Sequence, residues 1–293
     1  MKRNAALFSA FPVLLAMALS LYAGSEDRWR DFSKKVGDIK IRYLDSGSGD
    51  RTLIFIPGWT MTAEVWREQI PYFSARGFRV IALDPRSQGR TSKTDSGNTL
   101  QQQAADLHAF LQELNIEQCS LVGWASGAAV ILEYAYSSET YPPEKIVFVD
   151  GNPAGLESDD CPVSISVQEA RKLLYGLQDN RAKTTEQFVR SLFNVPQPEW
   201  LIKEMVEDSL RTPIGAAVSL YVDYFLGDRR AALASIAVPC LIMTTSENRT
   251  VGEYMQSKIL RPELKVIEGA GSAMFLEKPQ AFNQALESFL GDY

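Results

Sequence analysis

Residues 123–127, Gly-Trp-Ala-Ser-Gly, are the part of the sequence whose spacing most resembles a reactive site. They follow a short apolar run, Ser120–Val122, and precede a helical run, Ala128–Tyr136. Two glycines flanking the centre of a strand-to-helix turn indicate a turn so tight that side chains there would collide with backbone. Such a turn holds its central residue strained and exposed, as a nucleophile requires. The central residue is Ala125, and its methyl group cannot attack a carbonyl carbon.

Two other residues, Ser126 and His108, could in principle supply a nucleophile and a base. Ser126 follows Ala125 directly, but centring the turn on Ser126 would put Trp124 where the turn needs a glycine. The chain has one histidine, His108, about eight residues into a predicted helix and therefore about 12 Å from the start of that helix. We expect His108 to be a partly solvated residue remote from the turn.

The elements around the turn alternate between strands and helices. Short units of this kind predict a mostly parallel sheet covered by helices on both faces. The predicted strands are Ile39–Leu44, Leu53–Ile56, Phe78–Leu83, Ser120–Val122 and Lys145–Val149, and the predicted helices are Val65–Phe73, Leu100–Leu114 and Ala128–Tyr136.

The alternation stops after Lys145–Val149, and residues 152–237 show only helical patterns. Strands resume at Cys240–Met243 and Leu264–Ile267, and an amphipathic helix closes the chain. We therefore predict one α/β core, residues 26–151 and 238–293, carrying a helical cap, residues 152–237. The helices expected in the cap are Gln168–Gly176, Thr185–Phe193, Glu199–Leu210 and Thr212–Phe225.

Four segments in order along the chain resemble motifs of the α/β-hydrolase family. Residues 123–127 resemble its nucleophile elbow, Gly-x-Ser-x-Gly. Residues 55–59 resemble its His-Gly-x loop, residues 84–92 its Asp-x-Arg-Gly-x-Gly-x-Ser loop, and residues 268–277 its Gly-Ala-Gly-His loop. The resemblance covers residues 36–291 and is strongest to small esterases and cofactor-free haloperoxidase-like proteins. It implies a mostly parallel, doubly wound sheet of the α/β-hydrolase type with a helical cap insertion.

The resemblance also implies which positions would hold the catalytic triad. Ala125 stands at the nucleophile position and Ser272 at the position of the histidine base. A hydroxyl does not titrate near neutral pH, so Ser272 cannot replace an imidazole. The acid would fall at Asn248, or at Glu247 if the loop alignment shifts by one residue, or at Asp150 after the preceding strand. We therefore expect no intact catalytic triad.

Other parts of a hydrolase site do not depend on those side chains. By resemblance, the backbone N–H groups of Trp59 and Ser126 form the oxyanion hole. We expect a pocket beside them, lined by the aromatic residues Trp66, Trp124 and Phe275; the alternative is that these rings pack the core beneath the cap. The roof of that pocket, or alternatively the core of the cap itself, would be built from Trp200, Leu201, Met205, Tyr221, Tyr224 and Phe225.

The composition of the chain excludes some classes of binding partner and cofactor. A net charge of −6 over 293 residues provides no broad attraction for nucleic acid or for anionic membranes. The three cysteines, Cys119, Cys161 and Cys240, are odd in number and widely spaced, which argues against a disulfide framework. Cys119 and Cys240 begin predicted strands and should be buried. We find no cluster of metal ligands and expect no cofactor.

The N-terminus predicts export. Lys2 and Arg3 precede an apolar stretch, residues 5–23, which is typical of a secretory signal. Residues 1–25 would then be a signal peptide cleaved before Glu26, and the mature protein would be periplasmic or secreted. The alternative is an uncleaved N-terminal membrane anchor, because the stretch approaches the roughly 20 residues of a membrane span.

Three functions remain open. The first is a pseudo-hydrolase that binds a small apolar ligand with a carbonyl or carboxylate group beneath the cap. The second is a residual or unconventional hydrolase or lyase that acts on a small ester-like substrate without a Ser-His dyad, with Glu247 or Asp150 as the base. The third is an interaction protein of the cell envelope, with an unknown protein partner.

Overall fold

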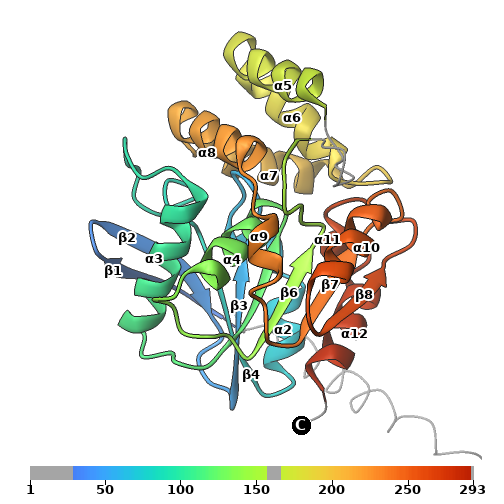
Figure 1. Ribbon diagram of the computed structural model, residues 1–293. Coiled ribbons are helices and arrows are strands. Elements are labelled where there is room, and N and C mark those ends of the chain that lie inside the picture. The colour runs from blue at the N-terminus through green and yellow to red at the C-terminus, as the bar shows by residue number, and fades with distance from the viewer. Residues whose placement is uncertain (1–28, 157–165, 292–293) are drawn as a thin grey trace, which may run out of the picture.

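The computed structural model describes residues 29–156 and 166–291. The predicted signal or anchor and Cys161 therefore lie outside the described residues. Figure 1 shows one central sheet with helices packed against both of its faces and a separate group of helices above one of its edges. This architecture confirms the predicted α/β-hydrolase-type fold with a helical insertion.

Eight strands of the described chain form one sheet in the order β1-β2-β4-β3-β5-β6-β7-β8. The pairs β1·β2 and β2·β4 are antiparallel, and all the other pairs are parallel. The carboxyl ends of β3, β5, β6 and β7 consequently meet at one edge. The strands are β1 Arg30–Val36, β2 Ile39–Asp45, β3 Arg51–Ile56, β4 Phe78–Leu83, β5 Ser120–Trp124, β6 Lys145–Val149, β7 Cys240–Thr244 and β8 Pro262–Val266.

Successive side chains of the central strands enter different halves of the core, because strand side chains alternate between the two faces of a sheet. On β3, Ile54 and Ile56 join the half that packs against α3 and α4, whereas Leu53 and Phe55 join the half that packs against α2 and α12. The helices of the core are η1 Ala63–Trp66, α2 Gln69–Ser74, α3 Leu100–Glu113, α4 Ser126–Tyr136, α10 Arg249–Lys258, α11 Met274–Glu277 and α12 Pro279–Leu290.

Between β6 and β7 the chain leaves the core and builds the cap. In Figure 1 the helices α5 to α8 lie above the sheet edge where β6 ends. The cap helices are α5 Val167–Asp179, α6 Arg181–Ser191, α7 Glu199–Leu210 and α8 Ile214–Leu226, followed by the short α9 Arg230–Leu233, which packs on α4.

Cys119 and Cys240 are both buried, at 4% and 0% exposure, as we expected of residues at strand starts. Between residues 29 and 156 and between 166 and 291, no helix is both long and apolar enough to cross a bilayer.

Candidate functional site

The turn at Ala125 has the strained backbone of a nucleophile elbow. Ala125 has φ 50° and ψ −111°, a conformation that L-residues rarely adopt. Its N–H donates to the carbonyl of Val149 at 2.9 Å. The flanking glycines are required: a Cβ on Gly123 would lie 2.4 Å from the carbonyl oxygen of Gly127, and a Cβ on Gly127 would lie 2.5 Å from that of Ile56. The reactive-site turn is thus fully formed around a methyl group.

A cavity of about 170 Å³ opens at this turn, between the carboxyl ends of the strands and the cap. It brings together Ala125, Ser126, Ser272, Asp150 and Asn248, residues that are widely separated in sequence. The remaining lining residues are Gly58, Trp59, Trp124, Asn152, Phe188, Leu192, Tyr221, Tyr224 and Phe225.

Ser272, at the position assigned to the base, is hydrogen-bonded to a residue of the elbow. Ser272 Oγ accepts a hydrogen bond from the indole Nε1 of Trp124 at 3.1 Å. Trp124 immediately precedes Ala125 and is 1% exposed. The hydroxyl therefore fixes an aromatic wall of the cavity, at the position that the family resemblance assigns to the base.

The two strand ends that offer an acid position meet in the cavity. The Nδ2 group of Asn248, after β7, donates to Oδ1 of Asp150, after β6, at 2.9 Å. Asp150 has φ 46°, a left-handed conformation that aspartate tolerates better than most residues do. Glu247 is exposed and does not line the cavity, so the alternative that puts Glu247 in the acid position is wrong.

The backbone donors of the expected oxyanion hole are both present. Trp59 and Ser126 line the cavity, and neither N–H is bonded to an acceptor in the part of the chain that the structure describes. The N–H of Thr60 is held instead by the side-chain oxygen of Gln88 at 3.0 Å. Unbonded N–H groups of residues that line a cavity can bind a carbonyl or carboxylate oxygen.

The cap is tied to the loop that carries Trp59. The indole Nε1 of Trp59 donates to the carbonyl of Ala217 on α8 at 2.8 Å. Thr60 Oγ1 lies 2.7 Å from Ser209 Oγ, and Thr62 Oγ1 donates to Asp208 at 2.8 Å. These bonds fix the cap helices α7 and α8 over the loop that carries the N–H group of Trp59.

The predicted pocket role of Trp66 and Phe275 is wrong. Both are 0% exposed, and their rings stack on each other with centroids 4.1 Å apart inside the core. Trp59 and Trp124 do line the cavity. Of the residues considered for the roof, three from α8 line the cavity, namely Tyr221, Tyr224 and Phe225, whereas Trp200 is exposed and Leu201 and Met205 belong to the core.

Sequence reasoning missed four lining residues: Gly58, Asn152, Phe188 and Leu192. Gly58 and Asn152 carry a usable signal, since each follows the end of a parallel strand, where ligand sites of such sheets form. Phe188 and Leu192 come from α6, and their position depends on how the cap folds over the sheet.

His108 is remote from this cavity, as expected. It is half-buried on α3, and its ring contacts Tyr134 and Tyr141 with centroid distances of 6.2 and 5.0 Å. The groove that it lines lies between α3 and α4 and contains none of the elbow residues. No imidazole is therefore available to Ser126, which is buried at the start of α4.

The charge of the cavity is set by Asp150, the single ionisable acid or base among its lining residues apart from the tyrosines. Burial, with a further contribution from the Asp150 carboxylate, raises the pKa of Tyr224 well above its ordinary value. The phenol consequently stays protonated at neutral pH and acts as a hydrogen-bond donor.

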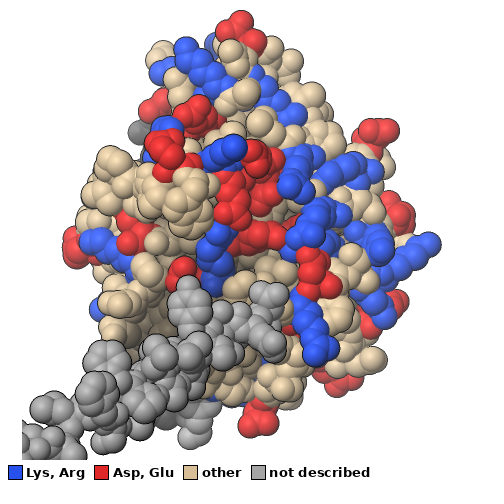
Figure 2. All heavy atoms as spheres, turned by 180° about the vertical axis from the view of Figure 1, so that it is seen from behind, with Lys and Arg blue, Asp and Glu red and all other residues tan. Residues whose placement is uncertain are grey.

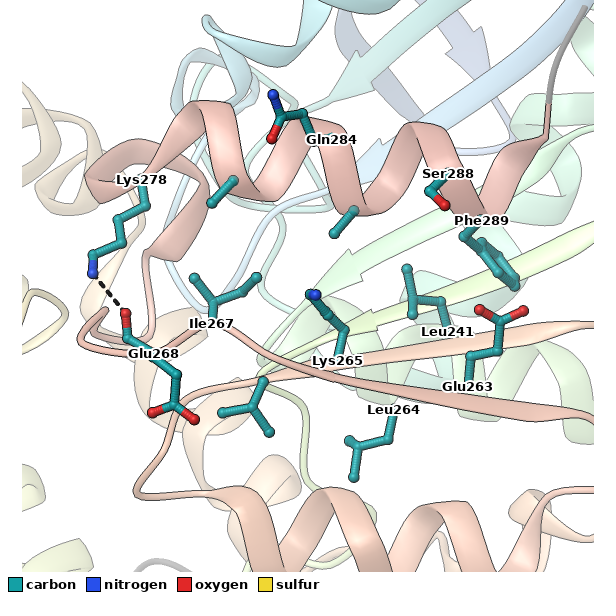
Figure 3. A pocket seen from close by; sticks show the side chains of 13 residues that line it. Leu241, Glu263, Leu264, Lys265, Ile267, Glu268, Lys278, Gln284, Ser288 and Phe289 are labelled. Atoms are coloured by element: carbon teal, nitrogen blue, oxygen red, sulfur yellow. Dashed lines mark hydrogen bonds between the residues drawn. The ribbon is translucent and has the colours of Figure 1, made fainter.

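A larger hollow of about 590 Å³ lies at the edge of the sheet, between β8 and α12. In Figure 3, Glu263 and Lys265 come from the strand β8, and Gln284 and Ser288 come from the helix α12. Lys278 donates to the backbone oxygen of Glu268 across its rim at 2.6 Å. None of the elbow residues lines this groove, so its size does not make it the functional site.

Basic and acidic side chains are interspersed over the face shown in Figure 2. That face therefore carries no extended surface of one sign.

Comparisons with known proteins agree with this geometry. A non-heme chloroperoxidase of Kitasatospora aureofaciens is 24% identical over 265 residues, 86% of this chain and 96% of that protein. A bifunctional esterase/perhydrolase of Acinetobacter calcoaceticus is 25% identical over 225 residues, 73% of this chain and 80% of that one.

Among solved structures, the bromoperoxidase from Bacillus anthracis matches with a TM-score of 0.83 at 23% identity, covering 90% of this chain and 100% of that one. An esterase from Exiguobacterium antarcticum also matches with a TM-score of 0.83, at 22% identity, covering 89% and 99%. The family model described as the alpha/beta hydrolase family matches residues 53–285, most of the chain. This chain therefore belongs to the alpha/beta hydrolase family, and its relatives include haloperoxidases and esterases.

Proposed function

We propose that the protein is a pseudo-hydrolase whose cavity binds a small, largely apolar molecule with a carbonyl or carboxylate group. This proposal rests on the residue at the centre of the elbow, because a fully formed turn presents the methyl group of Ala125 there. Ser272 stands at the base position and accepts a hydrogen bond from Trp124. Covalent catalysis needs a nucleophile and a base within hydrogen-bonding reach of it, and neither is available at Ala125.

Ligand binding is supported by what remains of the site. The unbonded N–H groups of Trp59 and Ser126, two residues that line the cavity, would donate to the oxygen of the ligand. Aromatic side chains make up much of the wall around them. A volume of about 170 Å³ is close to that of an apolar cavity of about 150 Å³ that binds benzene, so the ligand would have roughly that size.

Acetophenone, α-methylstyrene and phenylacetate are probes for this proposal. The first two have nearly the same shape but only acetophenone has an oxygen to accept hydrogen bonds, and phenylacetate adds a carboxylate. We expect acetophenone or phenylacetate to raise the melting temperature and α-methylstyrene to bind about tenfold more weakly, the effect of one or two lost hydrogen bonds.

A pair of variants locates the binding. Leu192→Phe adds volume to a buried residue that lines the cavity, whereas Leu226→Phe makes the same change on α8 at a residue that is 69% exposed. We expect the first to abolish probe binding and the second to leave it unchanged. The proposal is wrong if neither oxygen-bearing probe binds, or if Leu192→Phe binds them as the unaltered protein does.

A second candidate function is an unconventional hydrolase or lyase that uses Asp150 as a base. It is favoured by one observation: Asp150 lines the same cavity as the two free N–H groups. A carboxylate facing an oxyanion hole can abstract a proton adjacent to a carbonyl group. Exchange of the α-protons of bound acetophenone in deuterated water, absent in Asp150→Asn, would establish this function.

We also propose that the protein is exported. Support comes from the basic start at Lys2 and Arg3 and the apolar residues 5–23. Fractionation of expressing cells and the N-terminal sequence of the product test this. A product that begins near Glu26 indicates cleavage, an intact N-terminus in the membrane fraction indicates an anchor, and an intact chain in the cytosol contradicts export.

A further inference from the structure

Asp150 is an unusual carboxylate in this molecule. Its backbone N–H donates to the carbonyl of Met243 at 2.8 Å, and its left-handed φ of 46° fixes it at the end of β6. Oδ1 accepts one hydrogen bond, from the neutral amide of Asn248. Among the residues that the structure describes, no lysine or arginine forms an ion pair with it, and none lines the cavity.

Two buried carboxylates of this chain, unlike the partly buried Asp150, are matched by cations. Asp106 pairs with Arg86 at 2.7 Å, and Asp84 lies 3.4 Å from Arg42. Withdrawing a carboxylate from water without a cation is costly, and protein interiors normally supply one. Asp150 is only partly buried, and its described neighbours are the amide of Asn248 and the open cavity, with no cation. A ligand that enters the cavity can supply the positive charge to pair with Asp150.

The walls around Asp150 also suit a cation. The Trp59 ring lies 5.1 Å from that of Phe188 and 5.2 Å from that of Tyr221, measured between centroids. Tyr221 in turn lies 4.2 Å from Phe225, which contacts Tyr224 at 5.2 Å. These rings form a continuous aromatic lining. Aromatic faces attract ammonium groups within about 6 Å of their centres, and the attraction grows when water is excluded.

We propose that the ligand of this cavity is a cationic amine that also carries a carbonyl group. Its ammonium group would pair with the carboxylate of Asp150 against the aromatic lining, and its carbonyl oxygen would accept from the N–H groups of Trp59 and Ser126. The inference rests on the proposed function, because it names the ligand class for the same cavity. It selects against the carboxylate ligands that the N–H groups alone would accept, since a second anion would lie close to Asp150.

Three amides that differ only at one end test this inference: N-ethyl-3-aminopropanamide, N-ethylbutanamide and N-ethylsuccinamic acid. At neutral pH their terminal groups are an ammonium, a methyl and a carboxylate. We expect calorimetric titration to show the ammonium compound binding about tenfold more tightly than the neutral one, and the carboxylate compound most weakly.

Two variants separate the charge of Asp150 from its shape. Asp150→Asn keeps an oxygen for Asn248 and suits the left-handed backbone. We expect it to reduce the binding of the ammonium compound to the level of the neutral one. Glu247→Gln removes the same charge from an exposed residue outside the cavity and should change nothing.

Each outcome has a distinct meaning. Equal binding of the ammonium and neutral amides, or tighter binding of the carboxylate, would overturn the cationic ligand while leaving a carbonyl-binding cavity in place. An ammonium preference that survives in Asp150→Asn would overturn the role of Asp150. If none of the three amides binds although acetophenone does, the inference fails and the proposed function stands. If acetophenone and phenylacetate also fail to bind, both fail.

Discussion

At residue 125 the chain keeps a conformation that is costly for alanine. A non-glycine residue with φ 50° and ψ −111° costs of order 1–3 kcal/mol, and the surroundings must impose it. They do so here through the tight contacts of Gly123 and Gly127 and the hydrogen bond to Val149. In an active hydrolase this geometry presents a reactive oxygen. In this protein the strain remains without the oxygen that it would present.

Replacing Ala125 with glycine should therefore do little harm. Glycine adopts this backbone without strain, although it also gains conformational freedom in the unfolded chain, which offsets about 0.4–1 kcal/mol. We expect Ala125→Gly to leave the free energy of unfolding unchanged or to raise it by about 1 kcal/mol. Urea denaturation followed by circular dichroism measures this change.

Ala129→Gly is the matched control, because Ala129 is 0% exposed within the helix α4. There the same substitution removes a buried methyl group and lowers helix propensity, and it should destabilise the protein by about 1–2 kcal/mol. Equal destabilisation by both variants would contradict the claim that Ala125 is strained.

The sequence predicted which residues line the cavity where a motif fixes their position, and failed where tertiary packing determines it. Ala125 and Ser272 follow from the spacing of glycines and strands, and both line the cavity. The exclusion of Glu247 needed the structure, because it depends on which loop residues face each other across β6 and β7, where Asn248 meets Asp150. The burial of Trp66 and Phe275 depends on which face of the short helices η1 and α11 packs on the core, which the local sequence does not encode.

At the scale of elements, Asp84 connects two loops that shape the site. One of its oxygens accepts from the N–H of Ala63, at the start of η1, and the other accepts from the N–H of Arg90, both at 2.8 Å. The side chain is 1% exposed. Burial raises the pKa of Asp84 to about 6, against the opposing attraction of Arg42. The ionised carboxylate of Asp84 therefore holds the two loops at a cost in desolvation free energy.

Asp84 should give stability a characteristic dependence on pH. From about pH 4 to pH 6 the folded state holds a proton on Asp84 that the unfolded state has released, so the free energy of unfolding falls as pH rises. Below that window both states are protonated and above it both are charged, so the contribution is constant. Between pH 4 and 7 the unfolding free energy of the unaltered protein should fall by on the order of 2 kcal/mol relative to Asp84→Asn.

Urea denaturation at intervals across this range measures the difference between the two proteins. Asp95→Asn, at an exposed loop residue, is the control and should produce no such trend relative to the unaltered protein. A difference between the unaltered protein and Asp84→Asn that stays flat, or that grows as pH rises, would contradict the buried-carboxyl account.

The buried elements were largely predictable and the exposed ones were not. The strands β4 and β6 and the helix α7 begin and end where the sequence pattern places them. The strand β1 was missed because its side chains are mostly exposed and charged, so they show no alternation with the core. The predicted helix Val65–Phe73 is instead the short η1 followed by α2. The helix α10 also escaped notice, since it buries only Val251, Gly252 and Met255.

At the scale of the whole molecule, the fold of the alpha/beta hydrolase family surrounds an elbow that carries Ala125 at its centre. The sheet brings the ends of β3, β5, β6 and β7 to one edge, and the cap closes over them (Figure 1). The cavity is lined by the backbone of Trp59 and Ser126, by several aromatic rings and by the carboxylate of Asp150. Under the proposed function these features select a ligand, whereas attack on a carbonyl carbon would need a nucleophile, which the methyl group of Ala125 does not provide.

Labelling with a fluorophosphonate, which traps an activated serine, tests this account most directly. The probe is applied to the unaltered protein, to an Ala125→Ser/Ser272→His double variant, and to the esterase from Exiguobacterium antarcticum as a positive control for probe activity. We predict that the esterase is labelled and the unaltered protein is not, whatever the double variant does. Stoichiometric labelling of the unaltered protein, mapped to Ser126 by mass spectrometry, would contradict the central claim.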